Sequence, residues 1–202
     1  MPRLLIYYAH PGHRFSHANA EMVRRIRSRD DVTFVDLYAE YPRHDVSPDR
    51  EQARLLEHDV ILFQFPLFWY STPSIIKEWF DLVLEHGFAY GAGGDKLEGK
   101  VTMAALTAAG PEEAYSTDRY QHYPLRTFLT PLEQTARLCG MRFPAPYVLF
   151  GSLRAANDGR IPGHADGYLK LVDAICSGRF DFDRASGMDV LGPDTLPLYA
   201  EV

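Results

Sequence analysis

The chain alternates short apolar runs with longer stretches in which apolar residues recur at helical spacing. The apolar runs are strand-sized and do not alternate with polar positions: Arg3–Ala9, Val32–Leu37, Val60–Phe65, Val101–Thr107 and Tyr147–Phe150. Runs of this kind are typical of strands that are buried on both faces of a parallel sheet. The helical stretches lie between and after them: Ala18–Arg27, Arg50–His58, Ser74–Glu85, Leu125–Leu138 and Gly167–Cys176.

This alternation predicts an α/β fold with a doubly wound, five-stranded parallel sheet in the order 2-1-3-4-5 and helices on both faces. We expect one domain over residues 1–178, followed by an acidic tail over residues 179–202 that is rich in proline and glycine. Ligands of such folds bind at the carboxyl ends of the strands, where the strand order reverses. The loops after the first, third and fourth strands are therefore the candidate site.

The composition argues against several classes of function. The 202 residues carry a formal net charge of −6, which argues against a general nucleic-acid binder because such proteins need a basic face. No segment approaches the roughly 20 apolar residues of a membrane-spanning helix. The two cysteines, Cys139 and Cys176, fit neither a metal-ligand spacing nor a redox motif, so we expect reduced thiols, no metal and a cytoplasmic protein.

The first loop, residues 10–19, leads into a predicted helix, whose free N–H groups and dipole favour an anion. Ser16 and Asn19 add neutral donors, and the histidines and Arg14 can add positive charge. These features predict a phosphate cradle. A helix cap at Ser16 with solvated histidines explains the same residues equally well.

The other two loops carry aromatic and small residues. Pro66–Pro73 follows the most apolar strand and contains three consecutive aromatics, which favours a flat ligand stacked on them. A hydrophobic plug or a subunit contact remains an equal alternative. The loop from Thr107 begins with small residues that allow close approach of a ligand, and it continues to Tyr123. Any single Tyr or His in that loop is more often a solvated surface residue.

Taken together, the loops and several shorter motifs resemble a known family over roughly residues 3–178. The motifs are Tyr8-Ala9-His10-Pro11, Ser16-His17-Ala18-Asn19, Ala39-Glu40-Tyr41-Pro42, Phe65-Pro66-Leu67-Phe68-Trp69-Tyr70-Ser71-Thr72-Pro73, Lys77-Glu78-Trp79-Phe80-Asp81, Gly87-Phe88-Ala89-Tyr90-Gly91 and Leu138-Cys139-Gly140. The chain is similar to the flavodoxin-like NAD(P)H:quinone oxidoreductases. Within that group it looks most like the ancillary flavoproteins of glutathione-regulated potassium efflux systems.

The resemblance implies roles for individual residues. The segment along the flavin phosphate and ribityl chain matches His10, Ser16, His17, Ala18 and Asn19. The segment along the isoalloxazine matches Leu67, Phe68, Trp69 and Tyr70, and that around the pyrimidine edge matches Thr107, Ala108, Ala109 and Gly110. Tyr115 and His122 match the catalytic pair. The chain departs from the pattern at Ala108 and Ala109, where relatives tend to carry consecutive glycines.

The implied function is a flavin-dependent NAD(P)H:quinone oxidoreductase that transfers two electrons in a ping-pong cycle. The resemblance favours FMN, with FAD as the alternative, and a homodimer. Three other functions stay open: a regulatory ancillary subunit that meets a potassium efflux protein at the inner face of the cell membrane, a one-electron carrier, and a binding module without flavin.

Overall fold

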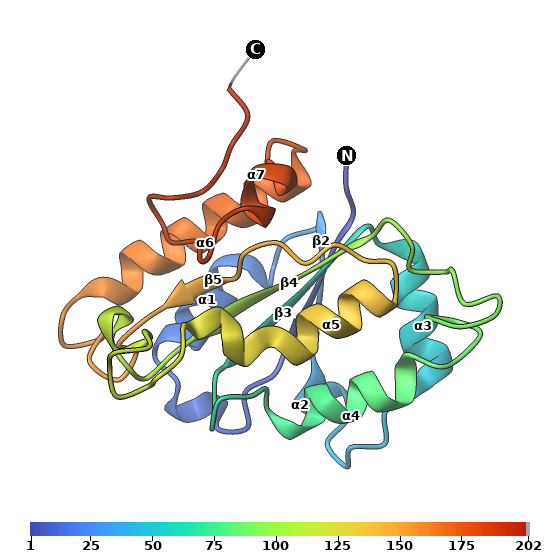
Figure 1. Ribbon diagram of the computed structural model, residues 1–202, viewed down its shortest axis with the longest axis horizontal. Helices are drawn as coiled ribbons and strands as arrows, with labels where there is room; N and C mark the ends of the chain where they lie inside the picture. The colour runs from blue at the N-terminus through green and yellow to red at the C-terminus, as the bar shows by residue number, and fades with distance from the viewer. Residues whose placement is uncertain (201–202) are drawn as a thin grey trace.

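A computed structural model describes residues 1–200, which form one twisted parallel sheet with helices on both faces (Figure 1). The strand order is β2-β1-β3-β4-β5, and all four pairings are parallel. The strands are β1 (Leu4–Tyr8), β2 (Val32–Asp36), β3 (Val60–Pro66), β4 (Val101–Thr107) and β5 (Tyr147–Leu149). The predicted α/β fold, including its strand order, is confirmed.

The helices divide between the two faces of the sheet. The α-helices are α1 (Ala18–Ile26), α2 (Leu37–Glu40), α3 (Pro48–Glu57), α4 (Ser74–Val83), α5 (Thr130–Leu138), α6 (Arg160–Cys176) and α7 (Phe182–Ser186). One core cluster joins residues of α3, α4 and α5 to Leu5 and Tyr7 of β1, whereas α1 and α6 pack with Leu4 and Ile6. Successive strand residues point to opposite faces, so the fully apolar strands supply both clusters.

Several elements differ from the sequence-based expectation: α7 was not predicted, and the predicted helix over Leu125–Leu138 is a 3-10 helix over Leu125–Leu129 followed by α5. Helix α6 begins at Arg160, two turns before the predicted start at Gly167, because Ile161, His164 and Ala165 are buried there. The sequence does not predict these two turns because Pro162 and Gly163 both have poor helix propensity. Tertiary packing overrides that propensity in the folded protein. Helix α2 has only four residues, and the Asp36 side chain caps it by accepting from the N–H groups of Tyr38 and Ala39. Within residues 1–200, no helix is both long and apolar enough to cross a membrane.

The segment from residue 179 to residue 200 covers one edge of the sheet. Phe180, Ala185 and Leu191 are buried in the same cluster as α6, and Leu191 forms a parallel bridge with Tyr147 of the edge strand β5. Covering an edge strand blocks unwanted pairing with another chain. The domain boundary at residue 179 stays a prediction, but this segment contributes buried side chains to the core.

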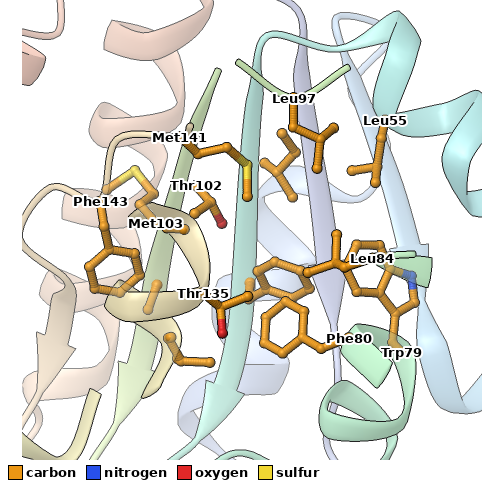
Figure 2. A pocket seen from close by; sticks show the side chains of 15 residues that line it. Leu55, Trp79, Phe80, Leu84, Leu97, Thr102, Met103, Thr135, Met141 and Phe143 are labelled. Atoms are coloured by element: carbon orange, nitrogen blue, oxygen red, sulfur yellow. The ribbon is translucent and has the colours of Figure 1, made fainter. Parts of the chain in front are cut away.

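An apolar cavity of about 20 Å³ lies between the sheet and helices α4 and α5. Figure 2 shows its lining, with Trp79, Phe80 and Leu84 on one side and Met141 and Phe143 on the other. It has room for about one water molecule, and apolar cavities of this kind stay dry. The space is therefore a packing gap and not a ligand site.

Beside this cavity lies a buried carboxylate. Glu51 of α3 is fully buried, and it accepts from the Tyr41 hydroxyl at 2.6 Å and the Trp79 indole N–H at 3.1 Å. The Tyr7 hydroxyl and the Arg54 guanidinium also donate to it. Burial, together with the charge of Glu51, keeps the pKa of Tyr7 well above its usual range, so this hydroxyl remains a donor. Glu51 thus joins α3 to β1, to α4 and to the turn after α2.

Replacing Glu51 tests how strongly the fold depends on this junction. We expect Glu51→Ala to lower the free energy of unfolding by about 3–5 kcal/mol, because it leaves the three buried donors of Tyr7, Tyr41 and Trp79 without their acceptor and leaves Arg54 with Glu40 alone. Urea unfolding measures the change. Glu57→Ala on the exposed end of the same helix is the control, and it should stay within about 0.5 kcal/mol of the wild type. Equal effects at the two positions would contradict the assignment.

Candidate functional site

Three loops meet at the carboxyl edge of the sheet, as the strand order requires. Strands β1, β3 and β4 are neighbours and end at Tyr8, Pro66 and Thr107, and the N–H of Leu67 donates to the carbonyl of Thr107 at 2.9 Å. A cleft of about 390 Å³ lies between the loops, within the range of roughly 300–1,000 Å³ that is usual for small-ligand sites.

The cleft gathers many of the residues named from the sequence. Those that line it are His10, Ser16, His17, Ala18, Asn19, Leu67, Phe68, Thr107 and Ala109. Trp69, Tyr70, Ala108, Gly110, Tyr115 and His122 are not part of its lining. Residues that the sequence analysis missed are Ser152, Leu153 and Ala156, which follow β5. The signal was available, because the carboxyl end of β5 lies at the same edge of the sheet.

The first loop presents the N-terminus of α1 to the cleft. The Ser16 hydroxyl accepts from the N–H of Asn19 at 3.1 Å, so Ser16 does cap the helix. A hydroxyl that accepts in this way keeps its own proton for another acceptor. The helix-cap interpretation and the anion-binding interpretation are therefore compatible, since one side chain can do both.

His10 lines the cleft as a neutral ring. It is half-buried, its Nδ1 accepts from the N–H of Gly12 at 3.2 Å, and its ring meets the edge of Phe68 with centroids 5.7 Å apart. Burial, together with the nearby His13, lowers the pKa of His10 below its usual value near 6.5. The backbone N–H groups at the start of α1 therefore remain as donors that favour an anion in this part of the cleft.

The second loop contains a strained two-residue turn. Phe68 and Ser71 exchange backbone hydrogen bonds of 3.1 Å, and the residues between them have φ values of 47° at Trp69 and 64° at Tyr70. This left-handed backbone is that of a hairpin turn which normally contains Asn and Gly. Trp69 is 92% exposed, while Tyr70 packs on Phe128 with ring centroids 4.9 Å apart. Such strain concentrates at functional sites, where each residue of this kind costs about 1–3 kcal/mol.

The third loop folds back over its own glycine. A Cβ at Gly110 would lie 3.1 Å from the Tyr115 ring and 3.1 Å from the Tyr120 hydroxyl, so a side chain there would force both tyrosines to move. Tyr115 is half-buried between Phe128 and Phe150, and burial raises its pKa, so its hydroxyl stays protonated. His122 is exposed, with a φ of 60°.

The comparisons with known proteins agree with this geometry. The chain belongs to the family described as having the flavodoxin-like fold, whose model matches residues 2–172. It is 40% identical to a glutathione-regulated potassium-efflux system ancillary protein, KefG of Cronobacter sakazakii, over 179 residues that make up 88% of this chain and 97% of the relative. The resemblance inferred from the sequence is confirmed.

Two solved structures are also similar. General stress protein 14 of Treponema denticola, solved in complex with FMN, has a TM-score of 0.79 and 31% identity, covering 86% of this chain and 99% of that chain. A protein from S. violaceusniger described as a thermophilic tryptophan halogenase has a TM-score of 0.80 and 36% identity, covering 84% and 98%. The differing descriptions mean that the shared fold does not by itself define one reaction.

The strained turn leads to a stability prediction. Trp69→Gly should raise the free energy of unfolding by about 1 kcal/mol, because glycine adopts left-handed backbone without the clash of a Cβ. Urea unfolding measures it. Trp69→Ala is the matched control: it removes the same exposed ring but keeps the Cβ, so it should stay within about 0.5 kcal/mol of the wild type. A gain of equal size in both variants would show that the ring, and not the backbone, is responsible.

Proposed function

We propose that the protein is a flavin-dependent NAD(P)H:quinone oxidoreductase. The observation that carries the proposal is the cleft itself, which has a helix N-terminus and the Ser16 hydroxyl on one side and the Leu67–Phe68 segment on another. A flavin has the same two chemistries, a phosphate and a flat aromatic ring. The FMN in the similar Treponema denticola protein supports the assignment.

The chain's own residues fit that cofactor. We assign the phosphate to the first turn of α1, where Ser16 has a hydroxyl proton to donate, and the ring to Leu67 and Phe68. Ala109 presents only a methyl group to the cleft, so the backbone there remains approachable. A bound flavin would supply the redox chemistry of a ping-pong cycle, in which NAD(P)H gives up a hydride and a quinone later collects two electrons in the vacated place.

The absorbance spectrum of the purified protein tests the cofactor assignment directly. We expect flavin bands in the visible range, and mass analysis of the group released by heat should identify FMN. Release of FAD would correct the cofactor but keep the reaction. A colourless protein that also fails to bind added FMN or FAD would overturn the proposal.

We also propose that Tyr115 and His122, on the loop that continues from Ala109 of the cleft lining, stabilise charge on the reduced cofactor. A protonated tyrosine can donate a hydrogen bond to that charge, and so can a ring N–H of an exposed histidine. Tyr115→Phe and His122→Ala should each slow cofactor reduction by NADH or NADPH about 10- to 100-fold, with little loss of occupancy. Stopped-flow absorbance measures the rate.

Tyr123→Phe is the control for these variants, because Tyr123 is exposed and contacts the same Phe128 ring with centroids 6.0 Å apart. A larger loss in Tyr120→Phe than in Tyr115→Phe would move the role to Tyr120, whose hydroxyl also lies against Gly110. Wild-type rates in both Tyr115→Phe and His122→Ala would show that neither residue takes part.

A regulatory ancillary subunit is the second candidate, and the 40% identity to an ancillary protein of a potassium-efflux system favours it. In that role the chain would act in the cytoplasm against the inner face of the membrane, and reductase activity would be incidental. Co-purification with a potassium efflux protein would support this role. Full quinone reductase activity in cells without such a protein would favour the enzyme.

We propose a homodimer that pairs through the groove between α4 and α5. This groove has a volume of about 530 Å³, and Phe80, Tyr90 and Leu138 are among the apolar residues that line it. Trp79 of α4 is not part of this surface, because it is buried against Glu51. Leu138 is 61% exposed, and symmetric pairing is the commonest way to cover such a surface.

Light scattering tests the dimer. The wild type should have twice the mass of the chain at micromolar concentration, and Leu138→Asp should be monomeric because it places a charge in the groove. Leu56→Asp on α3, at a position that is 49% exposed and outside the groove, should leave the dimer intact. A monomeric wild type would refute the dimer, and a dimer that survives Leu138→Asp would exclude this surface.

A further inference from the structure

Three polar side chains are buried together beneath the cleft, at the meeting point of α1, β3 and β4. Gln64 is 0% exposed, Asn19 is 2% exposed and Thr107 is 5% exposed. Asn19 and Thr107 also line the cleft, whereas Gln64 lies behind them and does not. Buried polar groups need hydrogen-bond partners, so the bonds among these three decide how each of them is oriented.

The contacts fix the direction of both amides. Gln64 Nε2 lies 3.3 Å from the carbonyl oxygen of Asn19 and 3.4 Å from its Oδ1, so a donor faces two acceptors. Because Oδ1 of Asn19 is on that side, its Nδ2 points the other way and donates to the Thr107 hydroxyl at 3.0 Å. Reversing either amide would place like groups against each other.

The orientation of the Asn19 amide determines whether the Thr107 hydroxyl donates or accepts. The Oγ1 of Thr107 uses a lone pair to accept from Asn19, and within residues 1–200 it makes no second hydrogen bond. A hydroxyl has one proton to donate, and this proton has no acceptor among those residues. Since Thr107 lines the cleft, the proton is available to an acceptor atom of a bound molecule. With the Asn19 amide reversed, Thr107 would donate to Asn19 and meet the ligand with a lone pair.

We propose that Gln64 is a positioning residue which, through Asn19, holds the Thr107 hydroxyl as a hydrogen-bond donor to the cofactor. This inference rests on the proposed flavin site. Stability alone does not explain the glutamine, because its Oε1 is buried without a partner in the described part of the chain. An apolar side chain of similar shape would avoid that defect. The hydrogen bonds that the Gln64 amide donates to Asn19 account for a glutamine at this position.

A double-mutant cycle separates this role from a structural one. The four proteins are the wild type, Gln64→Met, Thr107→Val and the double variant, and the measured quantity is the Kd for FMN from flavin fluorescence. Each single variant should bind FMN about three- to tenfold more weakly, since one hydrogen bond is lost. In the T107V background Gln64→Met should have no further effect, because the hydroxyl that it positions is gone.

Thr107→Ser is the rescue variant: because it restores a hydroxyl at this position, it should recover most of the FMN affinity that T107V loses. If Gln64→Met does not fold, Gln64→Leu replaces it in the cycle, and riboflavin serves as a second probe that lacks the phosphate. The replacement should weaken flavin binding by the same factor when Thr107 is present, and it should have no effect on flavin binding in T107V.

Two results would overturn the inference while leaving the proposed function standing. One is additive losses in the cycle, which would show that Gln64 acts by general stability. The other is unchanged FMN affinity in Thr107→Val. A wild type that binds neither FMN nor riboflavin would overturn the proposed function itself, and this inference would fall with it.

Discussion

The right-handed crossover between parallel strands is the constraint on which this molecule depends. From β1 the chain moves to β2 at one side of the sheet, and from β2 it must return past β1 to reach β3. Because both connections keep the same hand, α1 lies on one face and α3 on the other. The loops after β1 and β3 therefore leave neighbouring strands in opposite directions, and a crevice opens between them without any special residue.

The residues of the loops then supply this crevice with hydrogen-bond donors and an aromatic ring. The first loop ends in a helix whose N–H groups face the cleft, and the second ends in a turn that exposes an aromatic ring to solvent. Beneath the crevice, the side chain of Asn19 links two strands, because it contacts both Gln64 of β3 and Thr107 of β4. This polar junction joins the start of α1 to the ends of β3 and β4 beneath the cleft.

The parts that follow from periodicity could be predicted, and those that depend on irregular backbone could not. Apolar runs without alternation predicted the five strands and their order, and from that order the convergence of three loops. Nothing in the letters Trp69-Tyr70 signals left-handed backbone, because that turn normally contains Asn and Gly. The loop after β4 has no periodicity, so its sequence could not show that Tyr115 and Tyr120 both lie against Gly110. The residues that line the cleft after β5 were missed because the predicted site comprised only the loops after β1, β3 and β4.

Two unfavourable features of this structure lie at the carboxyl edge of the sheet, while the buried Tyr168 hydroxyl and His164 Nε2 of α6 also lack a partner among the described residues. The turn at Trp69 and Tyr70 is strained, and the Oε1 of Gln64 is buried without a partner in the described residues, both at the carboxyl ends of the strands. Glu51, which is equally buried but lies away from that edge, has all of its bonds satisfied by Tyr7, Tyr41, Trp79 and Arg54. The location of the strained turn and of Gln64 fits a scaffold whose stability resides in the two apolar clusters, so that the carboxyl edge can keep conformations which favour a ligand over the free protein.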